Sequence, residues 1–264
     1  MEALQFKNLE VRLAESESDI IAAQSLRYRV FYEEWNAKPT SRMASLHRDF
    51  DKFDEHCDHL LVIDRDRSNG DAHVIGTYRL LRGRVANRNG GFYSEGEYDL
   101  ASLRVFPGEI LELGRSCVDS EYRSRAVMQI LWRGLASYIS EHGVELMFGC
   151  ASFPGIKKNS LRIPLSYLYH FHLAPDPIRT KALSHRYVKM NRMPRSWINV
   201  KKTMKLLPPM IKGYLRVGGY VGEGAVIDRD FNTTDVCIIV KTAQITEKYQ
   251  RHFMGTSDPS RMVA

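Results

Sequence analysis

The sequence predicts a single α/β domain of the mixed (α+β) kind, in which one central sheet has helices on both faces. Three observations lead to this prediction. Strand-like apolar patterns alternate with helical ones along the first two thirds of the chain. Two pairs of strand patterns follow each other closely, as antiparallel neighbours do. One amphipathic helix joins two apolar strands, and such a unit requires a right-handed crossover between parallel strands.

The first half of the chain supplies a strand, a helix and a hairpin. Residues 9–16 (LEVRLAES) alternate apolar and polar side chains, as a half-buried strand does. Residues 18–35 have apolar side chains broadly at helical spacing, and Ser18 is placed to cap that helix. Residues 58–64 and 73–81 are predicted to be strands joined as a hairpin through the turn RSNGD at 67–71.

The second half supplies the crossover unit and two late strands. Strands at 108–119 and 144–152 flank a helix over 127–143, which Gly143 ends. A further helix is expected around 160–173, followed by strands at 224–231 and 234–242. The chain shows no repeat and no low-complexity linker. Residues 1–264 are therefore predicted to form a single domain, with its core at about 9–175, a basic segment at 176–222 and final strands at 223–264.

Positive charge is concentrated in one segment. The chain has a formal charge of +7, yet the stretch between Asp176 and Glu223 holds eleven Lys or Arg and no acidic residue. A block of one sign attracts an acidic protein, a nucleic acid or an anionic membrane. Basic and apolar residues interleave in KKTMKLLPPMIKGYLRV at 201–217, as in segments that lie on a bilayer. A solvated basic face is the alternative, and no nucleic acid is expected because no reading motif accompanies the charge.

The cysteines and the N-terminus indicate where the protein works. The four cysteines, at 57, 117, 150 and 237, lie far apart and have neither metal nor redox spacing, so we expect reduced thiols. The N-terminus has no apolar signal core, and no apolar run approaches the ~20 residues of a membrane span. The predicted location is cytoplasmic, with peripheral contact at the inner membrane left open.

Charged side chains inside or beside apolar strands are the informative ones, because burying an unpaired charge is costly. Arg27 and Phe31 are four residues apart on one predicted helix face, with Trp35 a turn further on. Gly114 interrupts a strand, where glycine commonly marks a bulge or a close approach of the backbone. The candidate site residues of these stretches are Arg27, Phe31, Trp35, Asp51, Asp54, Arg79, Glu112 and Arg115.

These stretches together resemble the acyl-homoserine-lactone synthases, a branch of the GCN5-related N-acyltransferase (GNAT) fold that uses acyl carrier protein. Over nearly its whole length the chain is more closely similar to the bacterial L-ornithine Nα-acyltransferases of ornithine lipid biosynthesis, a family often called hemolysin-like. The likeness lies in DKFDEHCDHLLV at 51–62, ELGRSCVDSEYRSR at 112–125 and LPPMIKGYLRVGGYVGEGAVIDRDFNTTDVCIIV at 207–240. The resemblance implies a GNAT-like mixed sheet flanked by helices, with a basic C-terminal extension.

The resemblance implies transfer of a 3-hydroxyacyl chain from acyl carrier protein to the α-amine of L-ornithine, which gives lyso-ornithine lipid. Acyl carrier protein enters as a co-substrate, and no cofactor and no metal are expected. The short spacing from Phe31 to Trp35 and the long C-terminal extension depart from the lactone synthases, which weakens the case for S-adenosylmethionine as acceptor. Glycine, another amino acid or S-adenosylmethionine stays an alternative acceptor. A non-catalytic membrane-surface protein is the alternative from another class.

Acyl transfer to an amine needs a base near the amine, donors for the oxyanion and an acid for the leaving sulfur. Glu112 is the expected base, with Arg115 and Asp54 beside it. Asp51 and Asp54 are placed to hold the ammonium groups of the acceptor. Arg79 and Arg115 orient these carboxylates or bind the carboxylate of the acceptor. An ion-pair network that only holds a loop to the sheet is the alternative, and the two roles can coexist.

The turn after the predicted strand 108–119 contains no glycine. In coenzyme-A-dependent GNAT enzymes the matching turn resembles a glycine-containing pattern that binds a pyrophosphate at a helix N-terminus. Here Ala126 and Met128 occupy the small-residue positions. A carrier-protein thioester brings one phosphate only, so Arg123 and Arg125 are predicted to meet that phosphate and the acids of the carrier protein.

Three further predictions concern aromatic residues and metals. Relatives of this fold place a tyrosine near the sulfur, and Tyr167 and Tyr169 are the candidates for the acid that protonates the leaving thiol. Phe31 and Trp35 are expected to be either core residues or the lining of an acyl tunnel. The histidines have no metal-binding arrangement in the sequence.

Overall fold

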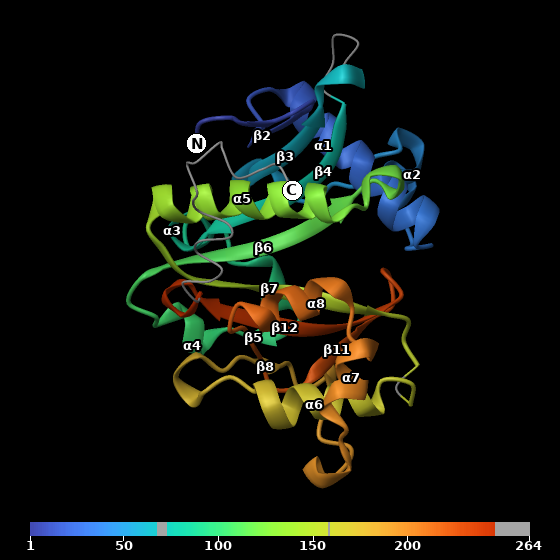
Figure 1. The fold of residues 1–264 in the computed structure, drawn as a ribbon, viewed down its shortest axis with the longest axis vertical. Coiled ribbons are helices and arrows are strands. Elements are labelled where there is room, and N and C mark those ends of the chain that lie inside the picture. The colour runs from blue at the N-terminus through green and yellow to red at the C-terminus, as the bar shows by residue number, and fades with distance from the viewer. Residues whose placement is uncertain (68–72, 158, 246–264) are drawn as a thin grey trace, which may run out of the picture.

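The computed structural model describes residues 1–67, 73–157 and 159–245, and arranges them around one large mixed sheet (Figure 1). Its strands are β1 (Leu4–Phe6), β2 (Leu9–Leu13), β3 (Asp58–Asp64), β4 (Val74–Arg82), β6 (Glu109–Val118), β7 (Val144–Pro154), β9 (Tyr187–Val188), β10 (Tyr220–Val221), β11 (Ala225–Asp228) and β12 (Thr233–Lys241). They lie in the order β1-β2-β3-β4-β6-β7-β12-β11-β9, with β10 also paired to β12. A small separate pair consists of β5 (Tyr98–Asp99) and β8 (Lys181–Ala182).

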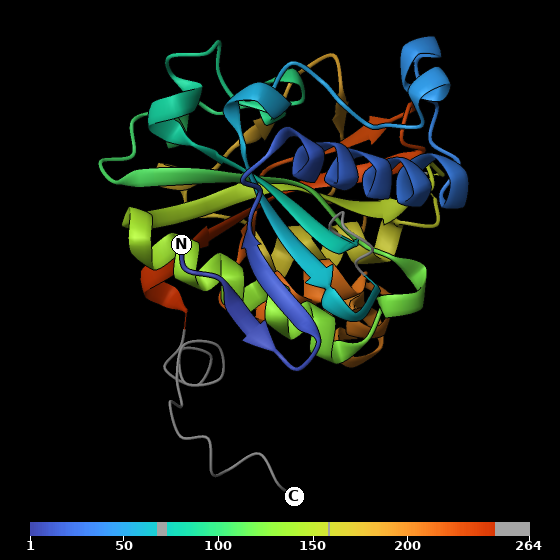
Figure 2. The same ribbon diagram turned by 90° about the horizontal axis from the view of Figure 1, so that it is seen from above.

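Helices cover both faces of the sheet, as predicted. They are α1 (Glu17–Tyr28), α2 (Ser41–Leu46), α3 (Gly83–Ala86), α4 (Ala101–Arg104), α5 (Arg125–His142), α6 (Arg162–His172), α7 (Val200–Leu206) and α8 (Pro209–Arg216). Figure 2 shows α1 on one side of the sheet and α5 on the other. Leu26 of α1 packs with Leu61 of β3, whereas Leu131 of α5 packs with Leu60 beside it. Successive strand residues point to opposite faces, so each face has its own core.

The predicted crossover lies at the centre of the sheet. β6 and β7 are parallel, α5 connects them, and the remaining paired strands of the main sheet are antiparallel. The Ser124 side chain accepts a hydrogen bond from the Val127 backbone N–H and caps the start of α5. Gly143 ends it at φ +60°, a left-handed conformation that glycine adopts without strain. The predicted hairpin of β3 and β4 is also present, although the turn at 67–71 lies largely outside the described residues.

The first helix is shorter than the predicted span of 18–35. Ser16 caps α1 by accepting from the Asp19 backbone N–H, so the predicted cap at Ser18 is wrong by two residues. After Tyr28 the chain continues to Glu34 as a π-helix. Its last bond runs from the Trp35 N–H to the Val30 carbonyl oxygen, 3.1 Å away. The wider turn changes the helical spacing on which the sequence prediction for Trp35 rested.

The two central strands diverge part of the way along. β6 and β7 are paired from Glu109 and Val144 as far as Glu112 and Phe148, and beyond that point each is paired only on its other side. Gly149 lies at the divergence. A Cβ atom there would lie 2.1 Å from the Leu113 carbonyl oxygen, so only glycine lets the two backbones pass this closely.

A bulge distorts β6 just after Gly114. The register between β4 and β6 shifts between Thr77 and Arg79, as the glycine in the strand indicates. The unusual backbone belongs to Arg115 itself, whose φ is +51°. A bulge redirects the side chain it carries, and this one redirects the charged side chain of Arg115.

The basic segment at 176–222 is built into the fold. Its short strands β9 and β10 pair with β11 and β12 of the main sheet, and β8 pairs with β5. Ile211 and Tyr214 of α8 are buried in the same core as α5. Figure 1 shows α8 lying over the sheet, with α6 and α7 beneath it toward the lower end. The segment is therefore part of the sheet and of the hydrophobic core, and not a separate tail.

Candidate active site

A cavity of about 1310 Å³ opens where β6 and β7 diverge. Gly114 and Arg115 line it from β6, and Cys150 and Ser152 line it from β7. One end is apolar and lies between α5 and α8, where the lining includes Met128, Trp132, Met210, Gly213 and Val217. The other end is polar, with Glu112, Arg115, Asp228 and Asp235 among its lining residues. The site thus combines space for a long apolar chain with a charged end.

A buried network of arginines and aspartates lies beside the polar end. Arg27 donates from Nε to Asp49 Oδ2 at 2.7 Å and from Nη2 to Asp54 Oδ1 at 2.8 Å. Arg79 donates to Asp51 Oδ1 at 2.7 Å. Arg115 donates to Asp49 at 3.2 Å and to Asp51 at 3.3 Å. It therefore links the aspartate bonded to Arg27 with the aspartate bonded to Arg79. Three guanidinium groups face three carboxylates here: Arg27, Arg79 and Arg115 against Asp49, Asp51 and Asp54.

The charges in this network stabilise one another. Burial alone would raise the pKa of the Asp49 carboxyl, but the attraction of Arg115 and Arg27 outweighs it and lowers the pKa to about 2. The same balance of burial against Arg27 and Arg79 lowers the pKa of Asp54. Tyr32 adds a hydrogen bond from its hydroxyl to Asp49 Oδ1 at 2.9 Å. Asp49 and Asp54 are therefore ionised, and all three aspartates are already paired with arginines.

The structure divides the predicted substrate residues into two groups. Arg79, Glu112, Arg115, Phe31 and Trp35 line the cavity. Arg27, Asp51 and Asp54 do not, and Arg27 is fully buried beneath it. For Arg27 the structure gives no support for direct substrate contact, because its bonds to Asp49 and Asp54 hold it inside the network.

Arg115 is held by ring faces as well as by carboxylates. Its guanidinium carbon lies 4.7 Å from the ring centre of Tyr93 and 4.7 Å from that of Phe231. Cation–π contacts of this kind are strongest away from water. Together with its left-handed backbone, they fix the group at the wall of the cavity.

Glu112 is buried and accepts two backbone hydrogen bonds. Its Oε2 accepts from the Tyr93 N–H at 2.9 Å and its Oε1 from the Ser94 N–H at 2.7 Å. Burial raises the pKa of the Glu112 carboxyl, and the bonds from Ser94 and Tyr93 oppose that rise only in part. A carboxyl with a raised pKa at a cavity wall is suited to proton transfer. Its bonds also position the loop at 93–94.

Arg123 lies at the mouth of the cavity, in an exposed ion pair. It contacts both carboxylate oxygens of Glu34, and its guanidinium carbon lies 5.7 Å from the Trp35 ring centre. Trp35 is 50% exposed, so it belongs to this mouth rather than to the core. Arg125 opens α5, but its side chain lies outside the described part of the structure.

Tyr167 and Tyr169, predicted as thiol acids, are absent from the lining of this cavity. Tyr167 is buried and donates to Met204 Sδ at 3.2 Å, and its hydroxyl lies 2.9 Å from His172 Nε2. The placement of the two residues on α6 gives no support for the predicted role. The tyrosines that line the cavity are Tyr78, Tyr93 and Tyr214, and the hydroxyl oxygens of Tyr78 and Tyr214 are 2.5 Å apart.

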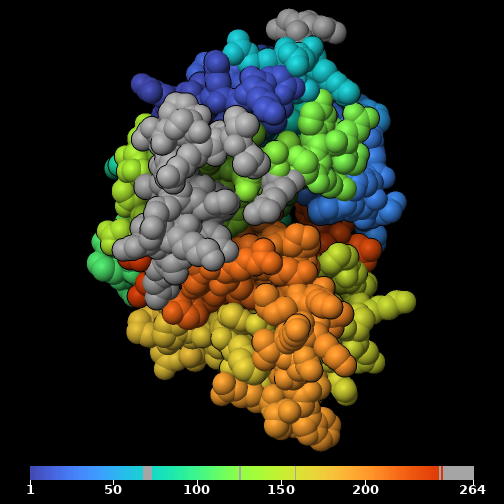
Figure 3. Space-filling model, viewed as in Figure 1, coloured from blue at the N-terminus to red at the C-terminus, as the bar shows by residue number. Residues whose placement is uncertain are grey.

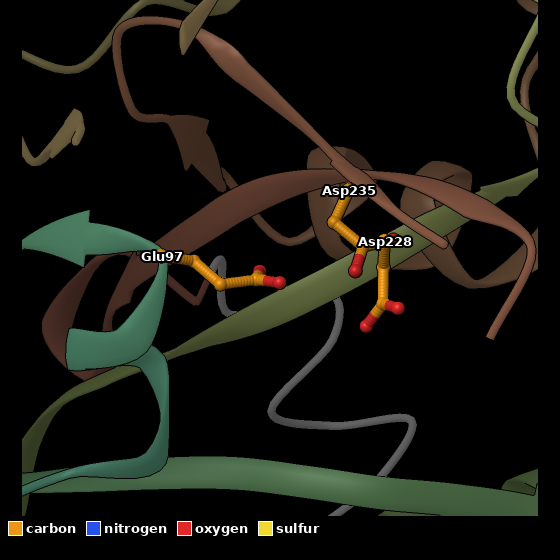
Figure 4. Close-up of side chains that lie close together, drawn as sticks. All are labelled: Glu97, Asp228 and Asp235. Carbon is orange, nitrogen blue, oxygen red and sulfur yellow. The ribbon is translucent and has the colours of Figure 1, made fainter. Parts of the chain in front are cut away.

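A second group of acids lies at the polar end. One carboxylate oxygen from each of Glu97, Asp228 and Asp235 lies within 4.8 Å of the others. Figure 4 shows these side chains converging from three elements of the chain. Burial, followed by repulsion from Glu97, raises the pKa of Asp235 to about 7. The sequence analysis missed this group.

Two residues of the site carried a signal that could have found them. Asp235 interrupts the apolar strand TTDVCIIV, which is the same kind of signal that selected Arg79. Asp49 lies two residues before the DKFD stretch. Glu97 and Asp228 had no such signal, because the contact between them depends on how distant strands meet.

Comparison with known proteins shows the fold and the relatives of the chain. Residues 26–133 match the family of acetyltransferase (GNAT) domains. The chain is 43% identical over 253 residues to the L-ornithine N(alpha)-acyltransferase of Agrobacterium fabrum, covering 95% of this chain and 86% of the relative. The N-acyl amino acid synthase FeeM from uncultured soil microbes aligns with a TM-score of 0.50 and 10% identity, covering 92% of this chain and 97% of that structure. The acyl-homoserine-lactone synthase LasI aligns with a TM-score of 0.47 and 14% identity, over 94% and 95% of the two chains. The predicted GNAT-like fold is confirmed.

Proposed function

This chain belongs to the L-ornithine Nα-acyltransferase family, and we propose that it transfers a 3-hydroxyacyl chain from acyl carrier protein to the α-amine of L-ornithine in the cavity between β6 and β7. The product is lyso-ornithine lipid. The observation that carries the proposal is the divergence of the two strands, with Glu112 and Arg115 at the polar end and an apolar space beyond. The alternative of a non-catalytic protein is excluded, because the family consists of acyltransferases.

The shape of the cavity supports a donor with a long flexible arm. The facing edges of β6 and β7 leave backbone groups without strand partners beyond Glu112 and Phe148. A phosphopantetheine arm carries amides that can bind such edges as an added strand does. The apolar space between α5 and α8 then takes the acyl chain, and Arg123 at the mouth meets the phosphate or acidic groups of the carrier protein.

The chemistry balances with groups of the chain and the substrates alone. The α-ammonium gives a proton to Glu112, directly or through a water molecule. The amine nitrogen attacks the thioester carbonyl, the carbon–nitrogen bond forms, and the carbon–sulfur bond breaks. The second amine proton ends on the leaving sulfur. The raised pKa of Glu112 suits the first step, because it makes the carboxylate a stronger proton acceptor than an ordinary glutamate. No metal or redox group is needed for this sequence.

The proposed base is tested by Glu112→Gln. We expect kcat to fall by about 100-fold or more, the usual contribution of a general base. Glu109→Gln is the matched control, since Glu109 lies on the same strand and pairs with Arg84 at 3.7 Å near the surface. Both variants must melt at the wild-type temperature, so that a loss of activity cannot be a loss of folding. Full activity in folded Glu112→Gln would remove Glu112 as the base.

The acceptor is tested by product formation. Purified protein is incubated with 3-hydroxyacyl carrier protein and labelled L-ornithine, and the label is followed into the organic phase. Glycine and S-adenosylmethionine run in parallel, with coenzyme A thioesters as alternative donors. Labelled lipid from ornithine supports the proposal. An organic-phase product only from another acceptor, or none from any combination, would refute it.

A surface near α7 supports contact with an anionic membrane, where the lipid product must go. Trp197 is 73% exposed, Leu206 56% and Val200 43%. Basic side chains flank them, namely Arg195, Lys201, Lys202 and Lys205. This part of the molecule projects at the lower end of the space-filling view (Figure 3). Within the described residues, no helix has the length and apolarity to span a membrane.

Exposed apolar side chains with basic neighbours bind bilayer surfaces that carry negative lipids. Vesicles of phosphatidylglycerol should therefore bind the protein more tightly than vesicles of phosphatidylcholine. Charge reversal at Lys201, Lys202 and Lys205 should weaken that binding and lower activity only in part. Equal binding of both vesicle types would contradict this proposal.

A further inference from the structure

We infer that Glu97, Asp228 and Asp235 form the binding site for the side-chain ammonium of a diamino acid acceptor, and so select ornithine over amino acids with uncharged side chains. The inference rests on the proposed function for the reaction but names residues and a specificity beyond it. It differs from the sequence prediction, which assigned the ammonium groups of the acceptor to Asp51 and Asp54.

The first ground for the inference is charge. Asp51 and Asp54 are already bonded to Arg79 and Arg27, so they offer little negative charge to a substrate. In the second group, the ion pair among the described residues joins Arg186 Nη2 to Glu97 Oε1 at 3.5 Å. Three carboxylates against one guanidinium leave an excess of negative charge at the polar end of the cavity. A cation is the chemistry that such an excess recognises.

The second ground is an unsatisfied acceptor. Asp235 is 6% exposed, and its Oδ1 atom has no hydrogen-bond partner within the described residues. Figure 4 shows its carboxylate turned toward Asp228. Buried polar atoms are nearly always bonded, so one that is not calls for a ligand. Primary ammonium has three donors, and each of the three carboxylates can accept one of them.

The third ground is position. Asp228 and Asp235 line the same cavity as Arg115 and Glu112. The Phe231 ring lies 4.7 Å from the Arg115 guanidinium, and the Phe231 N–H donates to Asp228 Oδ1 at 3.0 Å. Phe231 therefore lies between the guanidinium of Arg115 and the carboxylate of Asp228. An amino acid whose carboxylate is at Arg115 can extend its side chain toward the three acids.

Repulsion supports the same reading. Burial and the neighbouring Glu97 raise the pKa of Asp235 to about 7, and burial also raises the pKa of Glu97. The free protein therefore holds these charges at a cost, which a bound cation removes. Sites kept unfavourable in the free protein are commonly binding sites.

The test compares L-ornithine with L-norvaline, which has the same carbon chain but no side-chain ammonium. For the wild type we expect kcat/KM to favour ornithine strongly. Asp235→Asn and Glu97→Gln should each lower kcat/KM for ornithine by about 10- to 100-fold and leave the value for norvaline nearly unchanged. Glu223→Gln is the matched control, because Glu223 is half-buried nearby but pairs with Lys181 at 3.7 Å.

Direct binding separates this inference from the proposed reaction. Ornithine should raise the melting temperature of the wild type and of Glu223→Gln, and should do so much less for Asp235→Asn. This readout needs no turnover, so it holds even if ornithine is not acylated. An unchanged preference or an unchanged melting shift in folded Asp235→Asn would overturn the inference. So would Mg²⁺ or Ca²⁺ replacing ornithine as the ligand that stabilises the wild type and not this variant.

Discussion

The molecule contains two groups of three buried or half-buried carboxylates a short distance apart, and they differ in their partners. Asp49, Asp51 and Asp54 face three arginines, and the pKa of Asp49 is lowered to about 2. Among the described residues, Glu97, Asp228 and Asp235 form one ion pair with a base, that of Glu97 with Arg186, and the pKa of Asp235 is raised to about 7. The number of acids is the same, so the difference lies in the arginines.

The comparison indicates that one group serves the fold and the other serves binding. Paired buried charges stabilise a particular arrangement, because removing one partner leaves the other uncompensated. Unpaired buried acids destabilise the free protein and are retained only where a ligand supplies the missing charge. The arginine–aspartate network fixes the loop before β3 and the bulge in β6, whereas Asp228 and Asp235 of the second group line the cavity.

The largest expected effect comes from removing an arginine of the network. Arg27→Ala should lower the free energy of unfolding by about 3–5 kcal/mol, because Asp49 and Asp54 then lose their buried partner. Urea or guanidinium denaturation measures the change. Arg29→Ala is the control, since Arg29 is 47% exposed in its pair with Asp119 and should cost less than about 1 kcal/mol. Equal effects of the two substitutions would show that the network does not stabilise the fold.

The next effect has opposite signs in the two groups. Asp49→Asn should destabilise the protein at pH 8 by about 1–3 kcal/mol, whereas Asp235→Asn should stabilise it by a similar amount. The folded pKa of Asp49 lies below its ordinary value of 3.8, so its contribution is present above pH 4 and lost as the pH falls toward 2. The folded pKa of Asp235 lies above 3.8, so stability is lost as the pH rises from about 4 to 7.

The pH series checks these signs. Denaturation of wild type and Asp235→Asn at pH 4 and at pH 8 should give curves that nearly coincide at the lower pH and separate at the higher one. A stabilising effect of the same size at both values would mean that the carboxyl group does not ionise unfavourably. A destabilising effect at pH 8 would reverse the assignment of the second group to binding.

The sequence predicted the fold and part of the arginine–aspartate network, but not the group of Glu97, Asp228 and Asp235. The order of β3, β4, β6, α5, β7, β11 and β12 follows from local apolar patterns, which depend on neighbouring residues. The network was predicted in outline, because Arg79 and Arg115 were expected to orient the carboxylates of Asp51 and Asp54, and both contact Asp51. Two members of the network were not predicted as such. Asp49 went unnoticed, and Arg27 was given to the substrate although it is buried in the network.

The second group could not be predicted, for a physical reason. Glu97 precedes β5, Asp228 ends β11 and Asp235 lies in β12, so their contact depends on how distant strands pair. No local period encodes that pairing. The π-helix at Arg29–Glu34 and the left-handed Arg115 are likewise products of tertiary packing, which overrides local preference.

The acceptor affinity should depend on pH in a way that separates the two groups. Because Asp235 ionises near pH 7, KM for ornithine should rise by up to about tenfold for each unit below that value. KM for norvaline, which shares the α-amine, should stay nearly constant over the same range. Glu97, Ser152, Thr233 and Asp228 act on the titration of Asp235. Cys150, Arg186, Asp228 and Arg115 act on that of the neighbouring Glu97. Parallel pH profiles for the two acceptors would contradict the assignment.

The smallest effect on stability is expected outside both groups, at the exposed pair of Arg123 and Glu34. Exposed ion pairs contribute less than about 1 kcal/mol, so Arg123→Gln should leave the melting temperature almost unchanged. If Arg123 meets the carrier protein, the same substitution should raise KM for acyl carrier protein several-fold at low salt and less at high salt, since salt screens exposed charges. With an acyl-pantetheine donor that has no carrier protein, Arg123→Gln should change KM for the donor much less. Equal losses with both donors would move Arg123 from partner binding to the chemistry of the cavity.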